Sequence, residues 1–270
     1  MSGETVPEDW LFADSIGQPN LFDSFTDKEV GLTLLADFDY EAQLAAISSL
    51  LRLHKGSYND LRQTIAELDT LGRKTKGVMN DRVTSEWLEH MERSVYQDAA
   101  HSMAAVGMLA PLFESLLTQT FVSIQRTVEI DVAALSVHPR RRVSDEIFWD
   151  CHFVVTAKGR YQKDIVKGAS QLAEAIGLLT HLSPNFSLTL QALFAYRNKM
   201  FHLGFEWPIP ERDKFQKRLK DWPHWFTTAT TNNKPWIFYL TDTFILHCIE
   251  SIDNLLGGLG AFARPKRWHI

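Results

Sequence analysis

Residues 194–204 read FAYRNKMFHLG and form the end of a strongly helical segment. Upstream, the apolar side chains recur three and four residues apart, which is the spacing of one face of an α-helix. Pro184 stands near the expected first turn, where its missing N–H costs little. Gly204 follows the last periodic residue, where a glycine commonly ends a helix. We therefore predict a core helix that begins after residues 183–185 and ends at Gly204.

Helical spacing recurs along most of the chain and predicts an all-α helical bundle. Gly56 is expected to end the first helix, and Pro111 to kink or break the longest one. Strand-like alternation is weak, and residues 153–155 are its only candidate. Residues 1–35 read as an irregular N-terminal segment, followed by one helical domain over 36–270. The expected helices cover 37–56, 61–72, 87–126, 158–181, 186–203, 212–219 and 238–259.

Composition places the chain among ordinary globular proteins. Its 270 residues carry a formal net charge of -5, so a contact with nucleic acid has to come from a local basic patch. The two cysteines, Cys151 and Cys248, form no CxxC pair, which argues against a disulfide framework and a structural zinc site. The first residues lack an apolar signal-peptide core, and no run approaches the length of an uncharged membrane span. We expect a cytoplasmic protein without membrane contact.

An Arg-Asn pair in this segment is followed after three residues by a histidine: Arg197, Asn198 and His202. The pattern resembles the signature of the HEPN superfamily, whose members are helical bundles, usually dimeric, and often metal-independent endoribonucleases. An Arg with a His five positions on arises by chance roughly 0.6 times at this composition, but the added Asn lowers this to about 0.02. The motif also lies late in the chain on a core helix, as in that family. The resemblance implies a HEPN-like bundle over about 37–259.

The residue types of the motif suit cleavage of RNA by its own 2′-hydroxyl. His202 can take or give a proton near neutral pH. Arg197 stays charged and can hold two phosphate oxygens, and Asn198 can orient the imidazole or the phosphate. On an ideal helix Asn198 and His202 share a face, whereas Arg197 and His202 lie about 140° apart around the axis. They converge if the last turn opens at Gly204 or if two subunits meet, so we predict a homodimer.

By resemblance, the chain is expected to be a metal-independent endoribonuclease without a cofactor. The family implies a role in prokaryotic defence or in a toxin–antitoxin system, with a neutralising antitoxin as a partner. The alternative is a non-catalytic HEPN-like module that binds RNA or a nucleotide, or that dimerises. A metal-dependent helical-bundle enzyme is a third hypothesis, for which the sequence offers no matching Glu-x-x-His set. The site expected from the sequence consists of Arg197, Asn198 and His202 as catalytic residues, and of Lys199, Arg140, Arg141 and Arg142 as RNA contacts.

Other polar residues are weaker candidates. Asp98 with His101, and His247 with Glu250, place a carboxylate and an imidazole about one helical turn apart, which ordinary polar contacts explain as well. Glu114 interrupts an apolar face, either as an exposed residue or as a buried partner of the motif arginine. Four tryptophans either pack in the core or stack on bases. They are Trp207, Trp222, Trp225 and Trp236.

Overall fold

The structure is a computed structural model that describes residues 24–130, 138–222 and 224–266. This part of the chain is mostly helical, which confirms the predicted helical class. Two small antiparallel hairpins accompany the helices. The helices are α1 (Asp27–Leu34), α2 (Tyr40–Lys74), α3 (Val78–Thr127), α4 (Asp145–Trp149), α5 (Ile165–Ile176), α6 (Phe186–Leu203), α7 (Ile209–Arg218) and α8 (Asp242–Ala263), with the short 3-10 turns η4 (Pro139–Arg142), η5 (Leu178–His181) and η6 (Leu219–Asp221).

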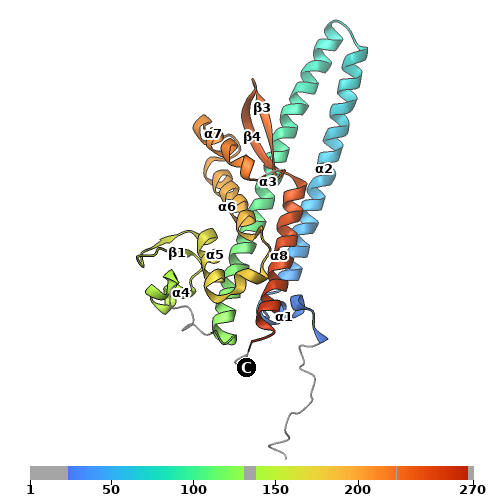
Figure 1. The fold of residues 1–270 in the computed structure, drawn as a ribbon. Helices are drawn as coiled ribbons and strands as arrows, with labels where there is room; N and C mark the ends of the chain where they lie inside the picture. The colour runs from blue at the N-terminus through green and yellow to red at the C-terminus, as the bar shows by residue number, and fades with distance from the viewer. Residues whose placement is uncertain (1–23, 131–137, 223, 267–270) are drawn as a thin grey trace, which may run out of the picture.

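The core lies where the C-terminal half of α3 meets α5, α6 and α8 (Figure 1). Leu109, Phe113 and Leu116 of α3 are fully buried there. Burial of each such side chain contributes about 1.5–3 kcal/mol, so packing holds this half of α3 in place. The prediction was a kink or a break at Pro111, and the break is wrong because the helix continues through this residue. Pro111 lies on the exposed side of α3, where water can bind the carbonyl that the proline leaves without a partner.

Helices α2 and α3 form a long antiparallel hairpin whose distal part projects beyond the core (Figure 1). Gly77 lies at the turn with a φ of 66°, a conformation open to glycine. α2 is one continuous helix, so the prediction that Gly56 ends a first helix is wrong. A glycine inside a helix costs only about 1 kcal/mol relative to alanine, and pairing with α3 along the hairpin offsets that cost.

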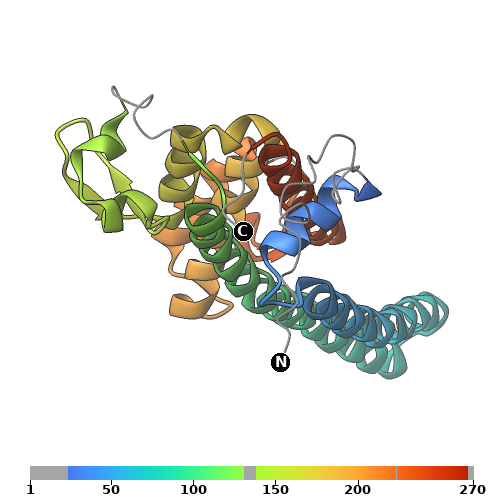
Figure 2. The same cartoon turned by 90° about the horizontal axis from the view of Figure 1, so that it is seen from below.

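The predicted irregular segment over 1–35 is corrected from residue 27 onward, where α1 begins; the part up to residue 23 lies outside the described residues. Thr26 and Glu29 form a capping box, in which the Glu29 N–H donates to the Thr26 hydroxyl at 3.2 Å. Figure 2 shows α1 beside α8, and the two helices pack closely. A Cβ at Gly31 would lie 2.1 Å from the Leu256 carbonyl oxygen, so this approach requires glycine.

The first hairpin joins β1 (Phe153–Val155) to β2 (Tyr161–Lys163). The strand candidate at 153–155 is therefore confirmed. The helix that was predicted from residue 158 begins only at Ile165, because residues 161–163 pair with β1 instead. Asp164 caps the helix by accepting the Lys167 N–H at 3.1 Å.

The second hairpin joins β3 (Phe226–Thr231) to β4 (Lys234–Leu240) and was not expected from the sequence. Its two-residue turn is Asn232-Asn233, with φ values of 50° and 61°. Positive φ at both turn residues matches the right-handed twist of paired strands, and asparagine tolerates it better than most residues. The last helix accordingly begins at Asp242 rather than at residue 238.

Helix α3 contains an apolar window that is long enough to cross a membrane by length and composition alone. In the structure, 56% of this window is buried inside the protein. The core helix of a soluble protein passes the same test, so the window gives only weak support for a membrane span.

Candidate functional site

The end of α6, which carries the motif, is held by contacts from two later segments. Tyr196 is fully buried and donates a hydrogen bond to the Phe238 carbonyl of β4 at 2.8 Å. Trp207 is also buried, and its indole N–H donates to the Gly204 carbonyl at 2.8 Å. Gly204 ends the helix with a φ of 72°, as predicted. The first bond joins α6 to β4, and the second satisfies the carbonyl of the residue that ends the helix, so both fix the position of α6.

Arg197 and Asn198 are in direct contact on this helix. The Arg197 Nη1 donates a hydrogen bond to Asn198 Oδ1 at 3.1 Å. The guanidinium carbon lies 5.7 Å from the centre of the Phe201 ring, a cation–π arrangement. Within the described parts of the chain, no carboxylate lies within 4.0 Å of this guanidinium. Arg197 therefore carries a positive charge that no acidic neighbour in those parts neutralises.

Phe201 adds an exposed aromatic ring to the motif. Its side chain is 51% exposed, although one edge rests against α3. A Cβ at Gly107 would lie 3.1 Å from the Phe201 Cζ, so the ring occupies the space that the glycine leaves. A base of RNA can stack on an exposed ring of this kind, next to a guanidinium that binds phosphate.

His202 lies in the last turn of α6 and is exposed. Among the residues that the structure describes, none forms a hydrogen bond with its ring. The helix stays regular through Leu203, so the last turn does not open as the sequence allowed. Arg197 and His202 therefore remain on different sides of α6, about 140° apart by the helical repeat. The meeting of two motifs across a subunit interface stays a prediction.

Lys199, an expected RNA contact, is engaged within the chain. Its ammonium forms an ion pair with Glu211 of α7, and Lys214 reaches the same carboxylate at 2.8 Å. Hydrogen bonds from Lys199 and then Lys214 lower the pKa of Glu211 to about 2. Lys199 thus links α6 to α7, and RNA would have to compete with Glu211 for its charge.

Arg140, another expected RNA contact, is fully buried, and this expectation is wrong. Burial lowers its pKa to about 10, and the guanidinium donates only to backbone carbonyls. It thereby connects α4, β1 and α5. Arg141 and Arg142 are exposed and remain candidates for phosphate contact. The carbonyls that accept from Arg140 belong to Ile147, Phe148, Asp150, Phe153 and Gly168.

A polar cluster next to the motif was not expected from the sequence. Glu206, two residues after Gly204, accepts hydrogen bonds from the Tyr96 hydroxyl and then from the Trp236 side chain, and these bonds lower its pKa. The Tyr96 and Trp236 rings meet edge to face, with centroids 5.5 Å apart. The three residues come from α3, the loop after α6, and β4, so no local sequence pattern could have joined them.

A second unexpected cluster lies between α4 and β1. Asp150, Cys151 and His152 place potential metal-binding atoms within 4.8 Å of one another. The His152 ring lies between two carboxylates, with Nδ1 2.8 Å from Asp150 Oδ1 and Nε2 3.4 Å from Glu114 Oε1. Glu114 thus pairs with His152 rather than with the motif arginine. The consecutive acid, thiol and imidazole at 150–152 were a signal that the sequence did offer.

The remaining candidates serve packing more than chemistry. Trp207 and Trp222 are buried, so neither can stack on a base. Trp225 stacks on His247, with the two ring centroids 5.2 Å apart. Burial raises the pKa of Asp98 in α3 to about 6, which marks this carboxyl as partly desolvated.

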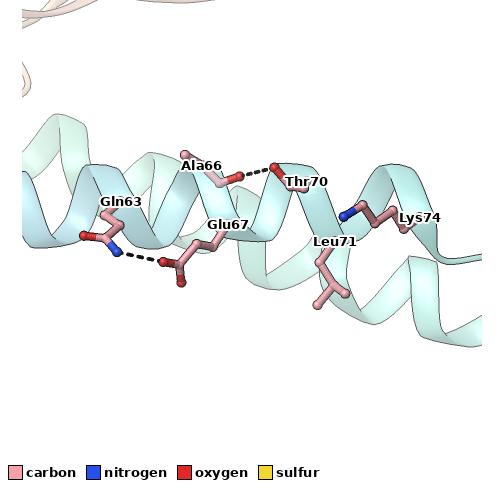
Figure 3. A pocket seen from close by; sticks show the side chains of 6 residues that line it. All are labelled: Gln63, Ala66, Glu67, Thr70, Leu71 and Lys74. Atoms are coloured by element: carbon pink, nitrogen blue, oxygen red, sulfur yellow. Dashed lines mark hydrogen bonds between the residues drawn. The ribbon is translucent and has the colours of Figure 1, made fainter.

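A shallow hollow lies on α2, in the projecting hairpin (Figure 3). All of its lining residues come from one face of this single helix, and Gln63 there donates to Glu67 at 2.9 Å. This hollow is therefore a feature of the surface of one helix, and it brings no side chains together from different elements. The lining residues are Gln63, Ala66, Glu67, Thr70, Leu71 and Lys74.

Comparison of the chain with protein-family models, curated proteins and solved structures found no match. The resemblance to the HEPN superfamily therefore depends on residues 197–202 and on the helical pattern around them.

Proposed function

We propose that this chain is a HEPN-type, metal-independent endoribonuclease that acts as a homodimer. The observation that carries the proposal is the guanidinium of Arg197, which no carboxylate of the described residues neutralises and which lies beside an exposed ring and five residues from an exposed histidine. A buried or ion-paired arginine would argue for a structural role, and Arg140 shows what that role looks like in this fold. Arg197 has no such partners among the described residues.

Each motif residue has a role that fits its surroundings. Arg197 can bind two oxygens of the scissile phosphate and stabilise the charge that builds up on it during attack by the 2′-hydroxyl. Asn198 accepts a hydrogen bond from Arg197, so its role is to aim the guanidinium. His202 can remove the 2′-hydroxyl proton or protonate the leaving 5′-oxygen. Because Arg197 supplies the positive charge at the phosphate, the mechanism does not call for a metal ion there.

A homodimer supplies what one helix lacks. One histidine cannot serve as base and acid at the same moment, and Arg197 and His202 do not converge within one regular helix. Two α6 helix ends that face each other across a two-fold axis would bring two histidines and two arginines to one phosphate. Light scattering at micromolar concentration should therefore report twice the mass of one chain, and a monomer would contradict the proposal.

The decisive experiment compares cleavage of RNA by the wild type and by His202→Ala, in excess chelator. We expect the wild type to form fragments that end in 2′,3′-cyclic phosphate, and the variant to be slower by about 10²–10⁴-fold, which is typical for loss of a general acid or base. His181→Ala is the matched control, because His181 is also exposed but lies in η5. Equal rates for wild type and His202→Ala, or loss of cleavage on chelation, would refute the proposed mechanism.

A non-catalytic RNA-binding or dimerisation module is the second candidate. The observation that favours it is the His202 ring, which no described residue orients, whereas a general base is usually held by a hydrogen bond on its other nitrogen. RNA binding that depends on Arg197, without cleavage by the wild-type dimer, would select this candidate.

By resemblance, the proposed nuclease would serve in prokaryotic defence or as a toxin with an antitoxin. Its expression alone should then arrest growth in a manner that requires His202.

A further inference from the structure

The second cluster, formed by Glu114, Asp150, Cys151 and His152, has no part in the proposed RNA chemistry. Glu114 lies seven residues along α3 from Gly107, which contacts Phe201. At 1.5 Å per residue this is about 10 Å along the helix. The other three residues belong to the segment between α4 and β1, which contacts α3 through Cys151 and His152. The cluster therefore forms a separate site at the junction of two parts of the chain.

Asp150 fixes the orientation and the tautomer of His152. Its Oδ1 atom accepts the backbone N–H of His152 at 2.8 Å and lies 2.8 Å from the ring Nδ1. A carboxylate at that distance requires a proton on Nδ1, so the neutral ring has its free lone pair on Nε2. A carboxylate that holds the outer nitrogen of a histidine is the usual second partner at metal sites, where it orients the ring and raises its basicity.

The distance between His152 and Glu114 matches the distance between two ligands of one tetrahedral metal ion. Nε2 lies 3.4 Å from Glu114 Oε1. This is too long for a charge-assisted hydrogen bond, which spans about 2.7–2.9 Å. Two ligands that each bind a tetrahedral zinc ion at about 2.0–2.2 Å are separated by roughly 3.4 Å. Two acceptor atoms thus face each other across a space that suits a cation.

Cys151 offers a sulfur donor next to His152. Its thiol is buried, lies within 4.8 Å of ligand atoms of Asp150 and His152, and contacts the Thr118 hydroxyl at 3.8 Å. The sulfur therefore lies beside the imidazole that faces Glu114. Burial raises the pKa of this thiol to about 11, so an ion has to displace its proton to water on binding.

The backbone of this segment is already rigid. The Arg140 guanidinium donates to the carbonyls of Asp150 and Phe153, on either side of Cys151 and His152. Helix α5 packs so closely behind them that a Cβ at Gly168 would lie 2.3 Å from the Cys151 carbonyl oxygen. Little reorganisation is therefore needed for binding, which favours affinity.

We propose that Glu114, Cys151 and His152 bind one divalent transition-metal ion of the zinc type, with Asp150 holding the outer nitrogen of His152. The mixed imidazole, thiolate and carboxylate set suits Zn²⁺ or Co²⁺ and disfavours Mg²⁺ and Ca²⁺, which prefer oxygen ligands. The ion fastens the segment between α4 and β1 to α3. It lies away from the motif, so it is structural and does not act on RNA.

Titration of the metal-stripped full-length protein with Co²⁺ tests this site without RNA. We expect one equivalent per chain, visible absorption bands of tetrahedral cobalt, and a near-ultraviolet band from the thiolate, all abolished by excess Zn²⁺. His152→Ala and Glu114→Gln should each lower the affinity at least tenfold. Asp150→Asn should lower it about 10–100-fold, as loss of an outer-shell partner does. Cys151→Ser should remove the thiolate band.

Cys248→Ser is the matched control, because Cys248 is the other buried free cysteine and lies in α8. It should bind Co²⁺ as the wild type does, and far-ultraviolet circular dichroism should show every variant folded. Glu114 and His152 are partly exposed, so their variants should keep the fold. Absence of cobalt bands in the wild type, or wild-type affinity in His152→Ala or Cys151→Ser, would overturn the proposal. Loss of RNA cleavage plays no part in these readouts.

Discussion

Arg140 and Arg197 occupy two regions of the molecule that treat the same side chain in opposite ways. In the segment from η4 to β1, Arg140 is fully buried and donates to five carbonyls, so its guanidinium holds the backbone in place. At the end of α6, Arg197 is partly exposed and, among the residues that the structure describes, donates only to Asn198. The difference shows that Arg140 serves the structure, whereas the charge of Arg197 is left accessible for the phosphate contact that we propose.

The largest effect should follow from Arg140→Ala, which leaves five carbonyls without their donor. Each buried unsatisfied polar group costs about 1–3 kcal/mol, so we expect a loss of at least about 3 kcal/mol in the free energy of unfolding, measured in urea. Arg141→Ala is the control, because the Arg141 side chain is exposed. This substitution should change the free energy of unfolding by less than about 0.5 kcal/mol. Wild-type stability in Arg140→Ala would show that these hydrogen bonds are dispensable.

The next effect concerns Arg197→Ala, which should lower the rate of RNA cleavage by about 10²–10³-fold, as loss of one charge-stabilising donor does. Stability should fall by no more than about 1 kcal/mol, the value of an exposed cation–π contact. Arg197→Lys should recover only part of the rate, because an ammonium cannot hold two phosphate oxygens in a fork. Arg93→Ala, at an exposed position of α3, is the control. A loss of stability without a loss of cleavage rate would mean that Arg197 has a structural role, as Arg140 does.

Local signals explain what the sequence predicted well. Gly204 at the end of α6 and the apolar face of that helix act over a few residues, so both were predicted and are confirmed. The three consecutive arginines at 140–142 were predicted to form a basic patch, because the local sequence shows their charge but not which of them is buried. The carbonyls that bury Arg140 reach as far as Gly168, and only the tertiary structure brings them together.

The sequence predictions failed where tertiary pairing decides the local structure. α2 runs through Gly56 because it pairs with α3, although glycine locally favours an end. β3 and β4 were missed because their apolar residues also suit a helix start, while the Asn232-Asn233 turn signal passed unnoticed. For the candidate site, the sequence predicted residues but not their arrangement, since no pattern within α6 says whether Arg197 and His202 meet.

A smaller effect should come from Arg141 and Arg142, the exposed neighbours of Arg140. If both contact phosphate, the double alanine variant should bind single-stranded RNA more weakly, and the slope of log affinity against log salt should fall by about 0.7 per lost contact. The measurement is best made in a His202→Ala background, so that the RNA stays intact. A double variant with an unchanged salt slope would confine the RNA contacts to the end of α6.

The smallest effect should come from the ion pair between Lys199 and Glu211, which joins α6 to α7. Lys199→Met should lower the melting temperature by no more than about 2 °C at neutral pH, because exposed pairs contribute little.

The pH dependence of this change identifies its cause. The pKa of Glu211 is lower in the folded protein, about 2 against an ordinary 4.5, chiefly because Lys199 donates to its carboxylate. A group with a lowered folded pKa stabilises the protein above its ordinary pKa, and that stabilisation is lost as the pH falls toward the folded value. The difference in melting temperature between wild type and Lys199→Met should therefore be constant above pH 5 and shrink between about pH 4.5 and 2. Lys234→Met, at an exposed lysine of β4, should show no such trend. A difference that persists at pH 2 would mean that the methylene chain of Lys199 stabilises the helix end through packing, and that its charge is free for RNA.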